Sequence, residues 1–159
     1  MVIKMAIRNI VKEGDPVLRK TCRSVLEFDE KLATLLDDMK DTMYKAEGVG
    51  LAAPQVGMLK RVCIVDVGDG LIELVNPVIV EQSGSQTGGE GCLSSPGEYG
   101  DVTRPMEVTV RAQDRFGKTF TVTGTELKAR AFCHEIDHLN GVCFVDLAKD
   151  IQIEKGEEK

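Results

Sequence analysis

The feature that most constrains this chain is the segment His134-Glu135-Ile136-Asp137-His138, which contains its only two histidines. Histidines four residues apart lie on one face of an α-helix, so both imidazoles can bind one metal ion. Glu135 follows the first histidine and can serve as general base toward a water molecule at the metal. The apolar neighbours that predict a buried helix are Ala131, Phe132, Cys133, Ile136 and Leu139. Burying two imidazoles without a shared ligand would be costly, so the segment predicts a metal site.

A hydrolytic metal site has three protein ligands and an open position for water. Because there is no third histidine, the remaining ligand must be a cysteine or a carboxylate. Cys92 is the main candidate, since it lies in the glycine-rich segment Gly88–Gly97, where the backbone can approach a ligand closely. Its alternative role is that of a small buried cysteine in a turn, which we also predict for the other four cysteines. Cys133 points away from the histidine face, because a helix turns about 100° per residue.

A third segment, Gly48–Gly57, is rich in small residues, and Gln55 is its only long polar side chain. Its pattern alone favours a loop that serves as a packing surface. The spacing of a dinucleotide-binding fingerprint is absent, and no strand is predicted before it.

Length and composition limit the class of protein. The 159 residues predict a single domain over 1–159. A net charge of −6 without a basic block argues against nucleic acid as a ligand, and no apolar run approaches the ~18 residues of a membrane-spanning helix. Five scattered cysteines and no export signal predict a cytoplasmic protein with free thiols.

The element pattern predicts an α+β fold with antiparallel sheets. We expect one N-terminal helix over 29–46, capped by Asp29, and a second helix over 125–139, capped by Thr125. In the best alternating strand, over 106–111, Met106, Val108 and Val110 point to one face. The other expected strands cover 61–66, 71–75, 78–82 and 119–123, and the tail over 151–159 is expected to fray.

The three segments together resemble the peptide deformylase family. Its motifs GxGxAAxQ, EGCLS and HExDH read here as Gly48–Gln55, Glu90–Ser94 and His134–His138. The similarity extends through Gly14–Arg19, Asn76-Pro77 and Arg104-Pro105. The resemblance implies antiparallel sheets packed around a central helix in the C-terminal half that carries HExxH.

The resemblance also implies the reaction and its metal. Family members remove the formyl group from the N-terminal formylmethionine of newly made proteins and release formate. Cys92, His134 and His138 would hold one divalent ion, usually Fe²⁺, which Zn²⁺, Ni²⁺ or Co²⁺ can replace. Formylmethionyl peptides and nascent chains are the implied partners, and neither nucleic acid nor a membrane is expected to bind.

The remaining site residues follow from the same resemblance. Glu135 would take the proton of the attacking water and pass it to the departing amine. The Leu93 backbone N–H and the Gln55 amide would hold the oxyanion. The residues that would pair with the substrate as an added strand are Gly48, Val49 and Gly50. Those that would brace the Cys92 segment are Glu90 and Arg104.

Two other functions are compatible with the residues. HExxH also occurs in zinc peptidases, although these use a third histidine or a glutamate as ligand. A structural metal site without turnover would need a fourth ligand, for which no CxxC pair is present. The residues Met1–Lys4 are expected to be an extension without function, and the acidic tail offers no footprint for RNA.

Overall fold

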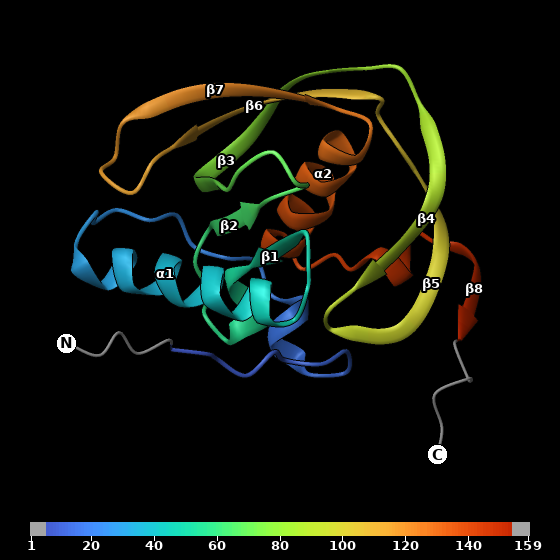
Figure 1. The fold of residues 1–159 in the computed structure, drawn as a ribbon, viewed down its shortest axis with the longest axis horizontal. Helices are drawn as coiled ribbons and strands as arrows, with labels where there is room; N and C mark the ends of the chain where they lie inside the picture. Colours follow the sequence, from blue (N-terminus) through green and yellow to red (C-terminus); the bar gives the residue numbers. More distant parts are fainter. Residues whose placement is uncertain (1–5, 154–159) are drawn as a thin grey trace.

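The computed structural model describes residues 6–153 and contains two helices and two antiparallel sheets, as the pattern predicts (Figure 1). The helices are α1 (Glu30–Lys45) and α2 (Leu127–Leu139). The larger sheet has the order β1 (Gly50–Ala52), β2 (Val62–Val65), β3 (Ile72–Ser83), β6 (Glu107–Gln113) and β7 (Thr119–Thr125). The smaller sheet has the order β4 (Gln86–Cys92), β5 (Ser95–Arg104) and β8 (Lys149–Ile153). Short 3₁₀ turns are η1 (Pro16–Arg19), η2 (Ala53–Val56) and η3 (Phe144–Asp146).

Helix α1 forms because its apolar residues recur every three or four positions. The Asp29 side chain caps it by accepting a hydrogen bond from the Leu32 N–H at 3.1 Å. Its buried residues pack on one face of the larger sheet, against Leu51, Val62 and Ile64. The residues that form this buried stripe are Leu32, Leu35, Leu36, Met39 and Met43.

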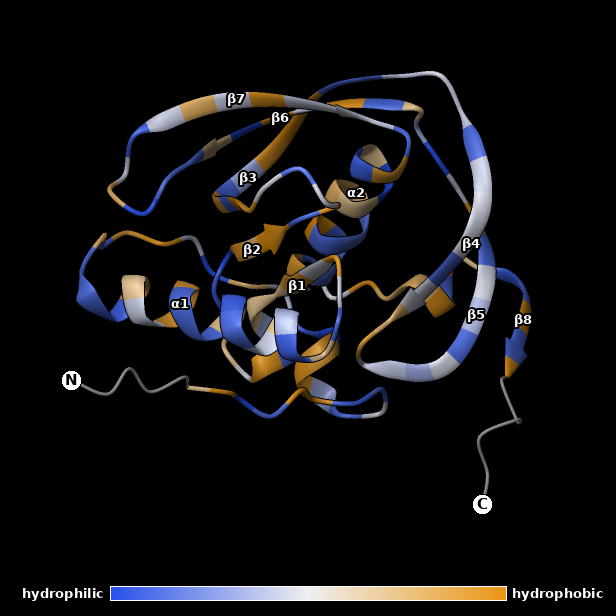
Figure 2. Ribbon diagram, viewed as in Figure 1, coloured by the Kyte–Doolittle hydropathy of each residue, from blue (hydrophilic) through white to orange (hydrophobic). Residues whose placement is uncertain are grey.

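Strand β2 is buried on both faces, which explains its uninterrupted apolar sequence. Because successive side chains of a strand alternate, Val62 and Ile64 face α1 while Cys63 and Val65 face α2. On the second face, Phe132 of α2 joins the same apolar cluster. Figure 2 shows β2 in the orange of hydrophobic residues, and Figure 1 shows α2 between the two sheets. None of the helices in residues 6–153 is long and apolar enough to cross a membrane.

The boundaries of several elements differ from the predicted ones. Thr125 does not cap α2, because it is the last residue of β7 and pairs with Glu107 of β6. Glu126 follows with a positive φ of 54° and turns the chain into the helix without a side-chain cap. Met106 lies outside β6 and is 38% exposed, whereas Val108 and Val110 are buried.

Two predicted strands, 71–75 and 78–82, are one strand, β3, with an irregularity between them. Asn76 occupies this position with a positive φ of 51°, and its side chain bonds both backbone groups of Val25, at 2.8 and 2.9 Å. The glycine-rich segment around Cys92 belongs to the β4–β5 hairpin. The predicted frayed tail is strand up to Ile153, and 154–159, like Met1–Lys4, lies outside the described residues.

Candidate functional site

A cysteine sulfur and two imidazoles converge where the β4–β5 hairpin meets α2. One ligand atom each of Cys92, His134 and His138 lie within 4.8 Å of one another, and Cys92 Sγ is 3.4 Å from His138 Nε2. Two donors that bind a tetrahedral ion at typical Zn–S and Zn–N distances are about 3.6 Å apart. The set therefore fits a divalent transition metal, and its mixed sulfur and nitrogen donors suit zinc, iron, cobalt or nickel.

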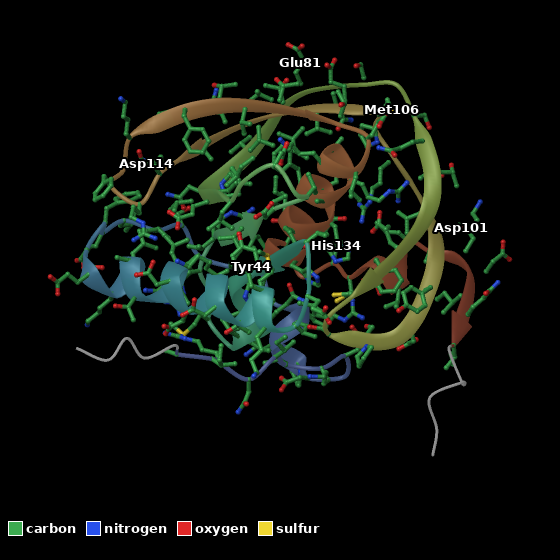
Figure 3. All side chains as sticks on the ribbon, in the orientation of Figure 1. Tyr44, Glu81, Asp101, Met106, Asp114 and His134 are labelled. Atoms are coloured by element: carbon green, nitrogen blue, oxygen red, sulfur yellow. The ribbon has the colours of Figure 1, made fainter. Side chains whose placement is uncertain are left out.

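The three donors come from two elements. Cys92 is the last residue of β4 and pairs with Ser95 across the hairpin turn. His134 and His138 lie on successive turns of α2, with ring centroids 5.0 Å apart. Figure 3 shows His134 in the interior, between α2 and the hairpin. Both histidines are buried, so an ion placed here would be largely shielded from solvent.

Glu90 orients the first histidine. Burial favours a raised pKa for the Glu90 carboxyl, but its hydrogen bonds with Arg104 and His134 outweigh burial and lower the pKa to about 2. The carboxylate is therefore ionised and only accepts, so His134 Nδ1 must donate to Glu90 Oε1 at 2.9 Å. This leaves His134 Nε2 as the nitrogen available to a metal.

The two histidines differ in charge state when no metal is bound. Burial lowers the pKa of His138 to about 3, so its lone pair is free at neutral pH. Burial also favours a lower pKa for His134, but the charge of Glu135 and the hydrogen bonds of His134 with Cys92 and Glu90 raise the pKa to about 10. Metal binding at His134 must therefore displace a proton.

Glu135 is a buried carboxyl group beside this cluster, and no cation pairs with it within residues 6–153. Burial raises its pKa to about 7, the range in which a carboxyl group exchanges protons efficiently at neutral pH. Its Oε1 has no hydrogen-bond partner among residues 6–153. A buried oxygen without a hydrogen-bond partner indicates that a molecule from outside the chain, such as water or substrate, supplies the missing hydrogen bond.

Gly50 of β1 makes room for this carboxyl group. A Cβ added at Gly50 would lie 2.8 Å from Glu135 Cδ, closer than carbon atoms pack. Gly48 has the same relation to Leu93, whose Cδ1 would be 2.8 Å from an added Cβ. The small residues of this segment therefore serve the site directly.

Gln55 has a fixed amide orientation. Its Oε1 accepts a hydrogen bond from the Ala52 N–H at 2.9 Å. Its Nε2 donates to Ser94 Oγ at 3.1 Å and lies 3.4 Å from Cys92 Sγ. The donor end of the amide thus faces Cys92 and Ser94. The pattern of the segment alone predicted only packing here, and Ser94 was not singled out.

A cavity of about 480 Å³ opens onto these groups. Its walls include the segment Gly48–Gly50 and Leu93, together with Gln55, Glu90, Cys92, His134 and Glu135. β1 forms one end of the larger sheet, so one edge of this short strand is not covered by another strand of that sheet. Sequence reasoning missed the lining residues Tyr99, Leu127 and Arg130. Arg130 was the only one of the three that its sequence context could have indicated. It lies between apolar residues of a predicted buried helix, and a buried guanidinium requires hydrogen-bond acceptors nearby.

Comparisons with known proteins identify the family of this chain. The family model described as polypeptide deformylase matches residues 7–154. A peptide deformylase of Alkaliphilus metalliredigens is 60% identical over 142 residues, which are 89% of this chain and 97% of that protein. The crystal structure of a peptide deformylase from Legionella pneumophila has a TM-score of 0.88 at 50% identity and covers 91% of this chain and 88% of its own. The deformylase of Synechococcus elongatus in complex with actinonin also has a TM-score of 0.88, at 38% identity, over 94% and 83% of the two chains.

Proposed function

This chain belongs to the polypeptide deformylase family, and on that premise we propose how its residues carry out the reaction of the family. The chain is a hydrolase that removes the N-formyl group from the N-terminal formylmethionine of newly synthesised proteins. The observation that carries the assignment of the site is the convergence of Cys92, His134 and His138 beside Glu135, which is buried and has an unpartnered oxygen.

Cys92, His134 and His138 would hold one divalent ion, Fe²⁺ in the cell, which Zn²⁺, Ni²⁺ or Co²⁺ could replace. The donor chemistry supports a transition metal of this group, since imidazole and thiolate suit all four ions. When bound, the ion supplies positive charge that lowers the pKa of a water molecule and polarises the formyl oxygen. Glu90 holds His134 in the ligating tautomer, and Arg104 holds Glu90 with hydrogen bonds of 2.9 and 3.0 Å.

Glu135 moves the proton. Its carboxylate accepts a proton from the attacking water as the water oxygen bonds to the formyl carbon. It then gives this proton to the amine nitrogen as the carbon–nitrogen bond breaks, which releases formate and a free N-terminus. The Gln55 amide and the Leu93 N–H stabilise the charge that develops on the formyl oxygen by donating hydrogen bonds to it. The orientation of the Gln55 amide toward Cys92 supports its part in this step.

The substrate peptide pairs with the segment Gly48–Gly50 as an additional strand. Two observations support this: the position of β1 at one end of the sheet, and the lining of the cavity by the same segment. The 45% exposed side chain of Val49 borders the cavity entrance.

One assay separates this function from the alternatives. Formyl-Met peptides and the same peptides with a free N-terminus are incubated with the metal-loaded protein, and formate and internal cleavage are both measured. Formate release alone is the expected result. Internal cleavage would indicate a peptidase, and stoichiometric metal without any product would indicate a structural site.

Gly50→Ala is expected to lower kcat by at least about tenfold while the metal stays bound. The new methyl group would displace the Glu135 carboxyl, and small misplacements of a catalytic group cause losses of this size or larger. Steady-state kinetics together with metal analysis checks the result. Gly57→Ala is the control for the general cost of replacing a glycine, because an added Cβ there meets no atom within 4 Å, although its φ of 84° adds strain. Equal kcat values for both variants would contradict the role of Gly50.

The protein loaded with Fe²⁺ under nitrogen is expected to be highly active and to lose activity in air. Oxygen can oxidise the iron or convert the Cys92 thiolate to sulfenic and sulfinic acids. Protein loaded with Ni²⁺ or Co²⁺ is expected to keep its activity. Zn²⁺ is expected to bind the protein well, but the zinc-loaded protein is expected to turn substrate over slowly, because tetrahedral zinc resists a larger coordination number. Formate release before and after exposure to air, with mass spectrometry of Cys92, tests this. An iron form that survives hours in air would contradict it.

A further inference from the structure

The metal donors lie on two elements that are separate in the sequence, so their geometry depends on how the β4–β5 hairpin is fixed to α2. Cys92 belongs to the hairpin, and both histidines belong to the helix. The bonds between Arg104 and Glu90 lie within the hairpin, because these residues are on β5 and β4. Bonds that cross from the hairpin to the helix help to hold the cysteine at the correct distance from the histidines.

Arg130 of α2 makes three such contacts from its Nη1, and because this atom carries two hydrogens, one hydrogen is shared between two acceptors. Its Nη1 donates to Glu90 Oε2 at 2.6 Å, to the Val102 carbonyl at 3.1 Å and to the Gly88 carbonyl at 3.3 Å. Gly88 and Glu90 are on β4, and Val102 is on β5, so one guanidinium contacts both strands of the hairpin. The Arg130 residue is only 7% exposed.

Gly88 of the hairpin leaves room for this guanidinium, because glycine has no side chain. A Cβ added there would lie 3.3 Å from Arg130 Nη2, tighter than side chains normally pack. Glycine at this strand position therefore lets the arginine approach the backbone closely.

The bonds of Glu90 show why Arg130 is not redundant. The two oxygens of a carboxylate offer about four acceptor positions. On Glu90, Arg104 and His134 occupy Oε1, and Arg104 and Arg130 occupy Oε2. The only other arginine in this cluster, Arg104, reaches the helix through Asp137 at 2.7 Å. The two arginines thus share Glu90 but cross the boundary in opposite directions: Arg104 of β5 bonds Asp137 of α2, whereas Arg130 of α2 bonds backbone carbonyls of the hairpin.

We propose that Arg130 is a positioning residue for the metal centre: it holds the β4–β5 hairpin on α2 so that Cys92 stays within binding distance of His134 and His138. This inference rests on the metal site of the proposed function. Residues that orient metal ligands typically change metal affinity or activity by about 10–100-fold.

The test is the affinity of Arg130→Met for Co²⁺ and Zn²⁺, measured by competition with a chelator and by the cobalt–thiolate absorption band. We expect the dissociation constants to rise at least about tenfold and the cobalt–thiolate band to weaken. Removing a cation would, by charge alone, strengthen the binding of a dication. A loss of affinity therefore reports geometry. Amide hydrogen exchange across β4 and β5 is expected to accelerate in the same variant.

Three further variants complete the design. Arg115→Met is the matched control, because Arg115 also pairs with two carboxylates, Glu73 and Asp37, but lies outside the residues that line the cavity. It is expected to lower Tm without changing metal affinity. Arg130→Lys should recover part of the affinity, and Gly88→Ala should reproduce part of the loss while the arginine remains.

Two results would be decisive. If wild type binds cobalt and Arg130→Met binds it equally or more tightly, the inference about Arg130 is wrong and the proposed metal site stands. If wild type and Cys92→Ala show the same cobalt spectrum, the proposed metal site itself is wrong. If Arg130→Met fails to fold, Gly88→Ala decides in its place, and unchanged affinity there contradicts the proposal.

Discussion

Glu135→Gln is expected to reduce kcat by a factor on the order of 10²–10⁴ or more while metal content and fold are retained. The amide has the size of the carboxyl group but cannot accept the proton of the attacking water. The loss should lie at the upper end, because the same group also returns the proton to the leaving amine. Gln also fits the buried position without an unpaired charge, so the free energy of unfolding should change little.

The measurement is the rate of formate release at saturating formyl-Met peptide, with metal content determined on the same sample. Glu81→Gln, on the exposed part of β3, is the matched control and should leave kcat unchanged. A Glu135→Gln protein with near-normal turnover would exclude Glu135 as general base. A variant that loses its metal as well would show that Glu135 is needed for binding and not only for proton transfer.

Cys92→Ala is expected to abolish both metal binding and activity and to leave a folded protein. Two imidazoles alone are a weak site for a divalent ion, since a hydrolytic centre uses three protein ligands. The core does not depend on the metal, because the apolar clusters on both faces of the larger sheet exclude these ligands. Circular dichroism should therefore be unchanged while metal content falls to background.

Cys22→Ala is the control for the loss of a thiol, because Cys22 is a buried member of the core. It should lower stability and keep the metal. If Cys92→Ala retained one ion per chain, another side chain would have to supply the third bond. Glu90 is engaged with two arginines and His134, and Asp137 pairs with Arg104, so of the nearby carboxylates Glu135, with its unpartnered oxygen, would be the one free to do so.

The sequence was sufficient to predict those elements whose structure is determined by a local residue pattern. Helix α1 follows from its apolar stripe and from Asp29, which satisfies a backbone N–H at its start. The antiparallel α+β class follows from the order of its elements, and the family from three motifs. A pair of histidines four residues apart indicated a metal on periodicity alone, before any family was considered.

Strands whose own sequence lacks an apolar pattern were not predicted. Strands β4 and β5 are rich in glycine and polar residues, so their sequence has a turn pattern. They form because each supplies hydrogen-bond partners for the other. Thr125 has the sequence context of a helix N-cap, but it pairs with Glu107 of β6 and so extends β7 to this residue. Strand pairing in the folded protein therefore overrides the local preference of Thr125 for a helix start.

The sequence by itself determined which residue types are candidates for holding a metal, but only the tertiary structure decided how their side chains are positioned. Glu90 and His134 are 44 positions apart, and Arg130 and Glu90 are 40 apart. No local periodicity connects residues at such separations. The packing of α2 between two sheets brings them together, and burial then requires that every charge find a partner. That requirement, which acts only in the folded protein, selects the partners of Arg130 and the tautomer of His134. The Glu135 oxygen is the exception, because it has no partner among residues 6–153.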